Sequence, residues 1–411
     1  MRILIIGINY APELTGVGRY TGEMVEALAA AGHEVRVITA PPYYPEWRVP
    51  AEYRSWWYRA ERSGDVTVYR CPIWVPEHPA ALKRLLHLAS FAVLALPVAL
   101  RQIAWKPDVV WTVEPALFAA PLSPMVARLC GAAAWLHIQD YEVDAAFDLG
   151  MLKGRRVRQF ALAVECFLLK RFDRVSTISQ RMLAKAKSKG VAEERLVFFP
   201  NWVDVQAIRP LLHVSSFREQ LKIPASAIVA LYSGNMASKQ GLEILGEVVR
   251  KLSGHMELFF VFCGDGSAKR DLQAQCEGLE SVRFISLQPM DRLNDLLGMA
   301  DVHLLPQRAD AADLVMPSKL TGMLSSGRPV VATAARGTEL ASVVEECGVV
   351  VPPGNGEALA AAILTLAGDA ALRGALGRAA REIAEQRLSQ ESILQRFERD
   401  LAACASSRKV R

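Results

Sequence analysis

The sequence lacks the cysteine spacings that bind metals or form reactive thiol pairs. Seven cysteines are scattered over 411 residues, and no two of them stand as Cys-x-x-Cys. This pattern predicts free, buried thiols and a reducing compartment. The chain also has no long basic run and no platform of interleaved basic and aromatic residues, so nucleic acid is not an expected partner.

Long apolar runs are missing as well. The longest covers 85–100 (LLHLASFAVLALPVAL) and contains His87, Ser90 and Pro97. Because a bilayer-spanning helix needs about 20 apolar residues, we expect a core or interfacial helix here, with deeper membrane insertion as the alternative. The opening MRILIIGINYAPE reaches glycine and proline too early for a signal peptide and predicts a first buried strand.

The net charge is small, and it is unevenly distributed. The formal net charge is +5, and residues 1–200 carry 25 lysines and arginines against 19 acidic residues. An excess of positive charge confined to one half of a chain indicates an anionic partner for that half. A membrane surface and a phosphorylated substrate both fit this description.

Short apolar segments alternate with helical patterns along the chain. The first series of expected strands covers 2–7, 34–40, 65–70, 108–113, 132–138, 175–179 and 195–200. The second covers 227–234, 257–266, 282–286, 301–306 and 329–334. Apolar strands separated by helices predict parallel sheets covered on both faces. We therefore expect an α/β protein with two doubly wound domains, 1–204 and 205–388, and a final helix at about 389–411.

A glycine-rich loop follows the first strand, but it is not a dinucleotide fingerprint. Eight residues separate Gly7 from Gly16, and the second strand ends in ITAPPYYP, with no acidic residue for a ribose hydroxyl. This pattern disfavours NAD. The loop with Gly16, Gly18 and Arg19 still predicts a helix start that approaches an anion or a sugar. A turn needed only for tight packing is the alternative.

Three loops in the second half predict a site for a diphosphate. Glycine loops follow strands in YSGNMASKQGLEIL and FCGDGSAKRDL, and MPSKL adds a helix start, although no Walker A motif is present. Lys239 and Lys319 both stand at loop-to-helix entries and are expected to flank the ligand. The candidate donor-site residues are Gly234, Asn235, Lys239, Gly264, Asp265, Gly266, Pro317, Ser318, Lys319 and Leu320.

The segment WLHIQDYEVDAA concentrates polar groups at one strand end. His137 is followed by Asp140, Glu142 and Asp144, but no second histidine stands nearby, so we do not expect a metal site. The alternatives are sugar contact by His137 and Asp140, a carboxylate nucleophile, and a helix cap formed by Glu142 and Asp144. Glu114, at another strand end of the same half, is a further candidate.

These motifs, in this order, resemble the family 4 glycosyltransferases of the GT-B fold. The resemblance covers nearly the whole chain and rests on TGVGRY, HIQD, PNWVD, YSGNMASKQGLE, FCGDG and PSKL followed by SGRPVVAT. It is closest for bacterial exopolysaccharide enzymes of the colanic-acid-type fucosyltransferase group. The resemblance implies two Rossmann-like domains, with the donor in the second, the acceptor in the first, and the final helix crossing back to the first.

The resemblance also implies a reaction and a set of roles. A retaining transferase would move a sugar, fucose or a similar hexose, from a nucleotide-diphosphate sugar to an acceptor hydroxyl, with GDP favoured over UDP. The leaving phosphate would take the acceptor proton, and neither a metal nor a further cofactor is expected. The implied catalytic residues are His137, Asp140 and Lys239, and the implied acceptor-side residues are Gly16, Gly18, Arg19 and Glu114.

Two positions depart from the family pattern. Gly322 stands where many relatives have the second glutamate of E-x7-E, and Asn235 stands where many have an arginine beside the donor-loop lysine. Lys239 therefore needs another cationic partner, for which Lys319, Arg308 and Arg19 are candidates. Two other functions stay open: a sugar-nucleotide 2-epimerase of the same fold, and a non-catalytic sugar-nucleotide-binding partner.

Two segments of the positive half combine basic and apolar residues. Segment 151–173 has Lys153, Arg155, Arg156 and Arg158 before an apolar helix, and Lys83 and Arg84 precede the apolar run at 85–100. Such helices are typical of contacts with an anionic bilayer, although core helices with solvated flanks are the alternative. A membrane contact fits an acceptor linked to a polyprenyl diphosphate and an enzyme peripheral on the cytoplasmic face of the cell membrane.

Overall fold

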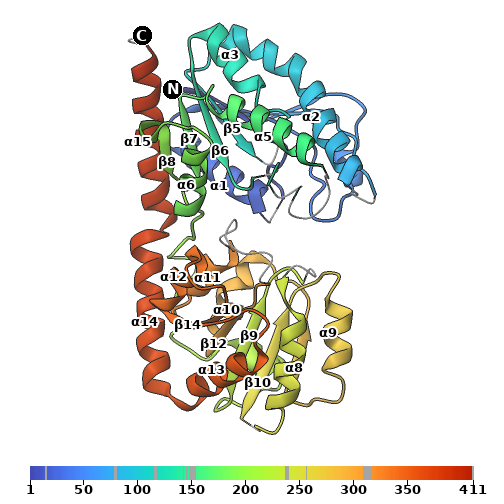
Figure 1. Cartoon of the computed structure of the whole chain (residues 1–411), viewed down its shortest axis with the longest axis vertical. Coiled ribbons are helices and arrows are strands. Elements are labelled where there is room, and N and C mark those ends of the chain that lie inside the picture. Colours follow the sequence, from blue (N-terminus) through green and yellow to red (C-terminus); the bar gives the residue numbers. More distant parts are fainter. Residues whose placement is uncertain are drawn as a thin grey trace. The chain divides into compact units, whose positions relative to one another are not determined.

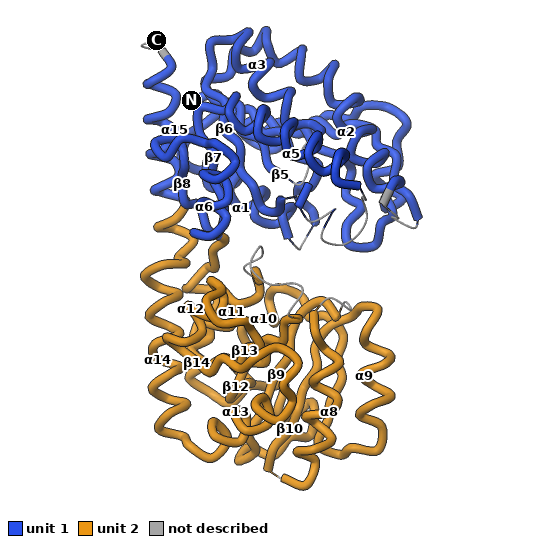
Figure 2. Tube along the Cα trace, viewed as in Figure 1, with its two compact units in different colours: residues 1–200, 394–411 blue, residues 201–393 orange. Residues whose placement is uncertain are grey.

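The structure, a computed structural model, describes all residues except 14–15, 78–80, 115–117, 142, 145–146, 148–153, 237–239, 256, 309–316 and 410–411. The described residues form two compact units (Figures 1 and 2). Unit 1 comprises 1–200 and 394–411, and unit 2 comprises 201–393. The domain boundaries predicted at 204/205 and 388/389 lie four and five residues from these divisions.

Unit 1 is built on an eight-stranded sheet in the order β3-β4-β2-β1-β5-β6-β7-β8. All neighbouring strands are parallel except β3 and β4. The central strands β1, β5 and β6 are almost completely buried because helices cover both faces. The strands are β1 (Arg2–Ile6), β2 (Glu34–Thr39), β3 (Arg59–Ser63), β4 (Val66–Arg70), β5 (Val109–Glu114), β6 (Ala133–Ile138), β7 (Arg174–Thr177) and β8 (Leu196–Phe198).

The helices of unit 1 divide between the two faces of this sheet. The connections through α2, α3, α5 and α6 all step along the sheet in one direction, so right-handed crossovers place these helices on the same face. The connection through α1 steps the opposite way and places α1 on the other face. The helices are α1 (Gly16–Ala30), α2 (Ala81–Arg101), α3 (Leu122–Cys130), α5 (Arg155–Leu169) and α6 (Gln180–Ser188). Short 3-10 turns occupy Ala51–Tyr53, Gln102–Trp105 and Glu193–Arg195.

The last helix, α15 (Gln390–Lys409), contributes its residues from Leu394 onward to unit 1, as the fold expectation required. Phe397 packs edge-on against Trp111 and Trp135, with ring centroids 6.2 and 5.4 Å away, and stacks on Phe199 at 4.2 Å. This aromatic cluster packs α15 against one face of β5 and β6. Burial of several large rings makes this contact a main part of the unit 1 core.

Unit 2 contains a six-stranded parallel sheet in the order β11-β10-β9-β12-β13-β14. A separate apolar cluster lies on each face of the sheet. The strands are β9 (Ile228–Ser233), β10 (Leu258–Cys263), β11 (Val282–Ile285), β12 (Val302–Leu305), β13 (Val330–Thr333) and β14 (Gly348–Val351). The helices are α7 (Ser216–Gln220), α8 (Glu243–Leu252), α9 (Lys269–Gln275), α10 (Leu293–Gly298), α11 (Lys319–Ser325), α12 (Glu339–Glu345), α13 (Gly356–Gly368) and α14 (Ala370–Arg387), with a 3-10 turn at Met290–Arg292.

The segment after residue 200 is fixed to unit 2 by hydrogen bonds. Val203 pairs with Ser389 as an isolated bridge, and the Arg381 guanidinium donates to the carbonyl oxygens of Val205, Ile208 and Ser325. A charged donor that satisfies three backbone acceptors holds the segment firmly. These bonds explain why unit 2 begins at Asn201.

The strand order of each sheet reverses once and so marks a place for ligands. In unit 1 the chain moves outward from β1 in one direction to β2 and in the other to β5, and in unit 2 β9 and β12 have the same relation. In open α/β sheets, ligands bind outside the carboxyl ends of the strands at such a point. The carboxyl ends of β1 and β5, and of β9 and β12, are therefore the places to search.

Candidate active site

The glycines of unit 2 bring two loops into backbone contact at the carboxyl ends of β9 and β10. A Cβ on Gly264 would lie 1.9 Å from the Gly234 carbonyl oxygen, and a Cβ on Gly266 would lie 2.6 Å from that of Met236. The Met236 amide also donates to the Asp265 carbonyl oxygen at 2.9 Å. Because any side chain would separate the loops, these positions require glycine. The predicted anion loops are thus held together by their own backbones.

Asp265 and Asn235 flank this contact with exposed side chains. The Asp265 carboxylate accepts hydrogen bonds from Lys269 Nζ at 2.6 Å and from the Leu287 amide at 3.3 Å. The bond with Lys269 holds the pKa of Asp265 below its usual value. Tyr232 donates to the Asn235 carbonyl oxygen at 2.6 Å. Both predicted donor residues therefore help to fix the conformation of their loops.

Lys319 is the strongest candidate for an anion ligand among the described residues. It begins α11, and its Nζ lies 3.2 Å from both Tyr232 Oη and Gln240 Oε1, and 4.3 Å from the centre of the Tyr232 ring. No carboxylate of the described part of unit 2 forms an ion pair with it. Burial lowers the pKa of Lys319 to about 7. A desolvated ammonium with only neutral partners is stabilised by any anion that reaches it.

The surroundings of Lys319 lie at the strand-order reversal of the sheet. A Cβ on Gly241 would lie 3.2 Å from the Arg308 amide nitrogen, so the loop after β9 touches the segment after β12. Arg308 lies 3.6 Å from Glu243, and both of their side chains are exposed. Pro317 and Ser318 precede α11, and Leu320 is a buried residue of its first turn. The described residues of the predicted donor site therefore lie together at one edge of the unit 2 sheet.

Two further sequence predictions for unit 2 concern Lys239 and Gly322. Lys239 lies outside the described residues, so its predicted contact with the diphosphate stays a prediction. Gly322, which replaces the family's second glutamate, lies within α11, and a Cβ there would be 3.2 Å from Leu297.

In unit 1, His137 occupies the interior near the carboxyl end of β6. Its Nδ1 lies 2.9 Å from Ser176 Oγ, and Gln139 Nε2 donates to its Nε2 at 3.0 Å. Its ring stacks on Trp111 at 5.5 Å. Burial lowers the pKa of His137 to about 3, so the ring is neutral at physiological pH. Because the Gln139 amide nitrogen can only donate, Nε2 accepts and Nδ1 carries the proton. Contact of Nε2 with a sugar would therefore require exchange of the bond with Gln139.

Asp140 and Glu114 stand at the same sheet edge. Glu114 ends β5 and is buried, whereas Asp140 is half-buried after β6. Burial raises the pKa of Tyr44, and among the nearby charges Arg84 lowers it while Asp140 and Glu13 raise it. Arg84, Asp140 and Glu13 therefore all lie near Tyr44 at the carboxyl edge of unit 1.

The glycine loop of unit 1 is organised around Glu13, a residue that the sequence patterns did not single out. Its carboxylate accepts from the amides of Tyr43 and Tyr44 at 3.0 and 3.1 Å and from Asn9 Nδ2 at 2.9 Å. Burial raises its pKa. A Cβ on Gly18 would lie 2.7 Å from Glu13 Oε2, which explains the glycine there. An isolated carboxylate between Pro12 and the glycines was the only signal available in the sequence.

The other two residues of that loop have local roles. Gly16 starts α1 with a positive φ of 61°, a conformation that favours glycine. Arg19 Nε binds Glu23 Oε1, one turn further along α1, at 2.6 Å. A ligand would therefore compete with Glu23 for the Arg19 guanidinium.

Asp144 belongs to a buried ionic cluster that joins three segments. Its carboxylate binds Lys189 Nζ at 2.6 Å and Lys185 Nζ at 3.0 Å, and Lys189 also binds Glu165 of α5. Lys185 and Lys189 both lie above the Tyr141 ring. Burial opposes the charged form of Asp144, yet the two lysines hold its pKa below the usual value. Asp144 therefore anchors the segment after β6 to α5 and α6. Glu142, the other predicted cap residue, lies outside the described residues.

Cysteines and metals add no further site within the part of the chain that the structure describes. All seven cysteines are free, and Cys71, Cys263, Cys276, Cys347 and Cys404 are buried, as predicted. Among the described residues, no group of three or more His, Cys, Asp or Glu side chains is placed to hold a metal ion.

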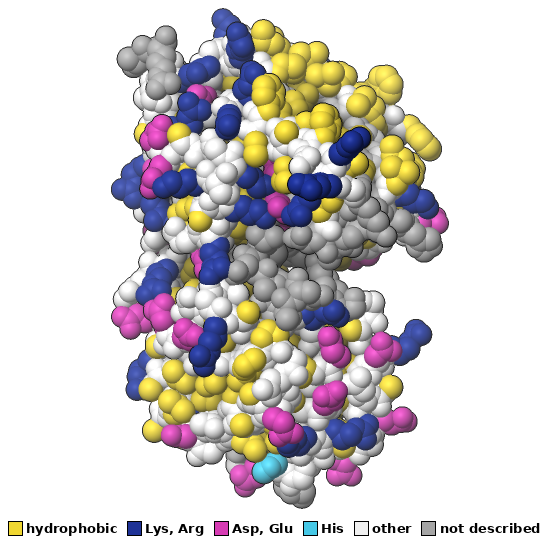
Figure 3. Space-filling model, in the orientation of Figure 1, with side chains coloured by type: hydrophobic (Ala, Val, Ile, Leu, Met, Phe, Trp, Pro, Cys, Tyr) yellow, Lys and Arg dark blue, Asp and Glu magenta, His cyan; other side chains and the backbone are white. Residues whose placement is uncertain are grey.

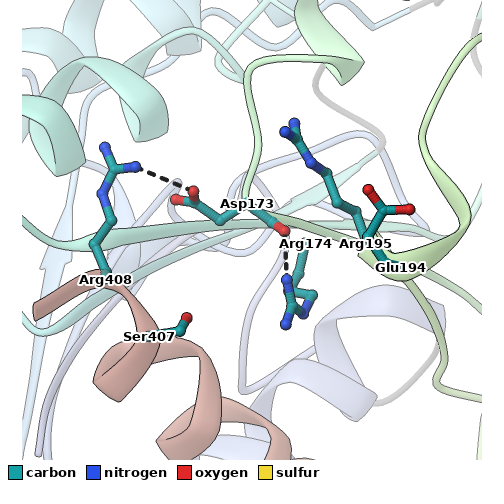
Figure 4. Close-up of a pocket in the computed structure, with 6 residues that line it drawn as sticks. All are labelled: Asp173, Arg174, Glu194, Arg195, Ser407 and Arg408. Atoms are coloured by element: carbon teal, nitrogen blue, oxygen red, sulfur yellow. Dashed lines mark hydrogen bonds and ion pairs between the residues drawn. The ribbon is translucent and has the colours of Figure 1, made fainter. Parts of the chain in front are cut away.

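A pocket of about 220 Å³ lies at the opposite end of the unit 1 sheet (Figure 4). It is lined by Asp173, Arg174, Glu194, Arg195, Ser407 and Arg408 (Figure 4). Arg408 binds the Asp173 carboxylate at 3.3 Å, and Arg174 donates to the Asp173 carbonyl oxygen at 3.0 Å. The amino ends of β7 and β8 form its floor, so this pocket is separate from the predicted site residues at the carboxyl ends.

Comparisons with known proteins agree with the two-unit architecture. Residues 15–202 match the family model for a glycosyl transferase 4-like domain, and residues 227–369 match that for glycosyl transferases group 1. The chain is 47% identical over 410 residues to WcaI of Escherichia coli (strain K12), covering 98% of this chain and 100% of that one. WcaI is itself only provisionally described as a colanic acid biosynthesis glycosyl transferase. The chain belongs to the family 4 glycosyltransferases.

Solved structures share the fold of this glycosyltransferase. Sucrose-phosphate synthase from Thermosynechococcus elongatus superimposes with a TM-score of 0.76 at 18% identity, covering 99% of each chain. HepE of Anabaena, solved with UDP and glucose, superimposes with a TM-score of 0.69 at 18% identity, covering 98% of this chain and 100% of that one. These structures show that the two Rossmann-like units have the GT-B fold. The family match shows that the protein is a glycosyltransferase.

Proposed function

We propose that this enzyme transfers a hexose, with fucose favoured, from a GDP-sugar to a lipid-linked oligosaccharide during exopolysaccharide biosynthesis. The assignment of a nucleotide-diphosphate donor rests on Lys319, a half-buried lysine with neutral partners at the carboxyl ends of β9 and β12. The full-length similarity to WcaI supports a role in exopolysaccharide biosynthesis. UDP in the HepE structure supports a nucleotide-diphosphate donor and leaves the preference for GDP to experiment.

The chemistry needs stabilisation of a leaving diphosphate. The bond between the anomeric carbon and the phosphate oxygen breaks, the bond to the acceptor oxygen forms on the same face, and the acceptor proton passes to the leaving phosphate. Fixed positive charge at the diphosphate lowers the barrier because it stabilises the charge that develops there. Lys319, together with the predicted Lys239, supplies that charge. His137 is neutral, so its part in this scheme is to hydrogen-bond the sugar.

A donor screen tests this proposal. Purified protein is heated with GDP- and UDP-sugars, and the donor that binds the native state raises the unfolding midpoint. We expect a GDP-sugar to do so, and Lys319→Gln to lower the transfer rate by about 100- to 1000-fold, as for loss of other charge-stabilising groups. Lys251→Ala, which breaks an exposed ion pair with Glu357 of the same unit, is the matched control and should leave the rate unchanged.

Product analysis separates this reaction from its alternatives. A transferase passes labelled sugar to an acceptor that partitions into organic solvent. An isomerised sugar nucleotide formed without acceptor would identify a 2-epimerase, and donor binding without turnover would identify a non-catalytic partner. Full activity of Lys319→Gln would contradict the donor-site assignment.

A further inference from the structure

Helix α2 of unit 1 is apolar on its outer side as well as on its inner side. Phe91, Ala95 and Ala99 are fully buried against the unit. On the opposite side an apolar stripe follows helical spacings of three, four and seven residues, and Leu82 and Val93 are 70% and 67% exposed. The complete stripe is Leu82, Leu86, Val93, Leu96 and Leu100. Soluble helices normally turn polar residues outward, so this stripe requires a partner.

Three exposed tryptophans are tied to the same helix. Trp56 and Trp57 are 100% and 75% exposed, and the next residue, Tyr58, donates to the Leu94 carbonyl oxygen in the middle of α2 at 2.9 Å. Trp74 is also exposed, and its carbonyl oxygen lies 2.6 Å from Nδ1 of His87 on α2. Tryptophans gather at the boundary between lipid and water because the ring combines an apolar body with a polar N–H.

A second apolar stripe lies on α5, on the same face of the sheet. Val157, Phe160, Val164 and Phe167 are exposed, and Arg171 lies 4.3 Å from the ring centre of Phe167. In Figure 3, apolar side chains gather over the part of unit 1 that carries α2 and α3 in Figure 1, with Lys and Arg side chains nearby. Both stripes thus belong to one helical layer.

The charges beside the stripes are of one sign. Segment 81–101 contains Lys83, Arg84 and Arg101 and no acidic residue. Segment 155–171 has five basic residues and a single acidic one, Glu165, which is buried and paired with Lys189. Two helices whose exposed charges are all cationic complement an anionic bilayer, where headgroups attract the cations and the interface accepts the apolar side chains.

We propose that α2, with the Trp56–Trp57 segment and Trp74, is a docking face that lies flat in the interface of an anionic bilayer. This inference rests on the proposed lipid-linked acceptor, and it specifies which surface reaches the lipid. We name Leu82, Leu86, Val93, Leu96, Leu100 and the three tryptophans the docking face. Helix α5 adds a second apolar stripe and basic residues to the same layer.

The flat orientation follows from the inner side of α2. The segment Leu82–Trp105 is long and apolar enough to cross a membrane by length and composition, with a mean hydropathy of 1.6. However, Gln102 at its end is buried and accepts from Arg36 of β2 at 2.9 Å. A spanning orientation would expose the buried side of α2 and break this bond, whereas flat docking keeps both.

Vesicle binding with tryptophan quenching tests the docking face. The full-length protein is mixed with vesicles of equimolar phosphatidylcholine and phosphatidylglycerol that carry bromine on the upper acyl chain. We expect tryptophan emission to be quenched, binding to weaken in high salt or with phosphatidylcholine alone, and most of the quenching to disappear in W56F/W57F/W74F. Each cation near such a surface contributes about fivefold to partitioning, so K83Q/R84Q should bind at least about tenfold more weakly.

Matched variants separate docking from folding and from catalysis. Val93→Ser with Leu86→Ser should weaken vesicle binding and leave the unfolding midpoint unchanged, whereas Leu212→Ser, a 99% exposed leucine of unit 2, should change neither. Equal vesicle binding by wild type and V93S/L86S would overturn the docking face, and resistance to alkaline extraction would overturn the flat orientation. Sugar transfer without vesicle binding refutes the face alone, whereas vesicle binding without donor turnover refutes the proposed function alone.

Discussion

At the residue scale, the pKa of Lys319 predicts how the affinity for the donor changes with pH. Its pKa is about 7 in the free enzyme because burial disfavours the charged form, and a bound diphosphate would favour that form. Below pH 7 the lysine is already charged, so donor affinity should be constant there. Above pH 7 binding must take up a proton, and the dissociation constant of a nucleotide sugar should rise about tenfold per pH unit. Calorimetric titration from about pH 6 to 9 measures this slope.

The control for this prediction is Lys319→Arg. An arginine stays protonated throughout this range, so its dissociation constant should be independent of pH even if it binds more weakly. A flat profile in the wild type would show that Lys319 does not face the diphosphate.

Residue identities at the site were easier to predict than residue environments. Lys319 was singled out by its place at a helix start, but its partners Tyr232 and Gln240 are 87 and 79 residues away in the sequence. Glu13 was missed because its amide partners at Tyr43 and Tyr44 are about 30 residues distant. Such partners are brought together by the sheet order, which no local pattern encodes.

At the element scale, the buried strands were predictable and the exposed ones were not. The almost completely buried and mostly apolar β1, β5 and β6 match the expected ranges closely because burial on both faces favours a nearly continuous apolar run. Strand β3 (Arg59–Ser63) was missed because it is a mostly exposed edge strand of sequence RAERS. Strand β14 (Gly348–Val351), an edge strand of four half-buried or buried residues, was missed as well.

The ionic cluster around Lys189 predicts how strongly α5, α6 and the segment after β6 hold together. Lys189→Met would leave the buried carboxylates of Asp144 and Glu165 without their shared partner. Breaking a buried pair in this way costs about 3–5 kcal/mol, so urea denaturation should show a loss of that size. Lys187→Met, two residues away, removes only an exposed pair with Glu193 and should leave the urea midpoint nearly unchanged. If both variants lost the same unfolding free energy, the buried cluster would stabilise the fold no more than an exposed ion pair does.

At the scale of the whole molecule, the two units should respond separately to ligand. The described residues of the diphosphate site belong to unit 2, whereas seven of the eight tryptophans belong to unit 1 and only Trp202 to unit 2. Tryptophan fluorescence therefore follows the unfolding of unit 1, and circular dichroism follows both units.

A nucleoside diphosphate without sugar provides the probe for this difference. At about 100 times its dissociation constant it stabilises the unit that binds it by about 2.7 kcal/mol, which for a unit of this size corresponds to roughly 5–10 °C. We expect GDP to raise a transition seen by circular dichroism by that amount and to leave the fluorescence midpoint unchanged. An equal shift of both signals would contradict a site confined to unit 2, because a ligand stabilises only the part of the chain whose folding creates its site.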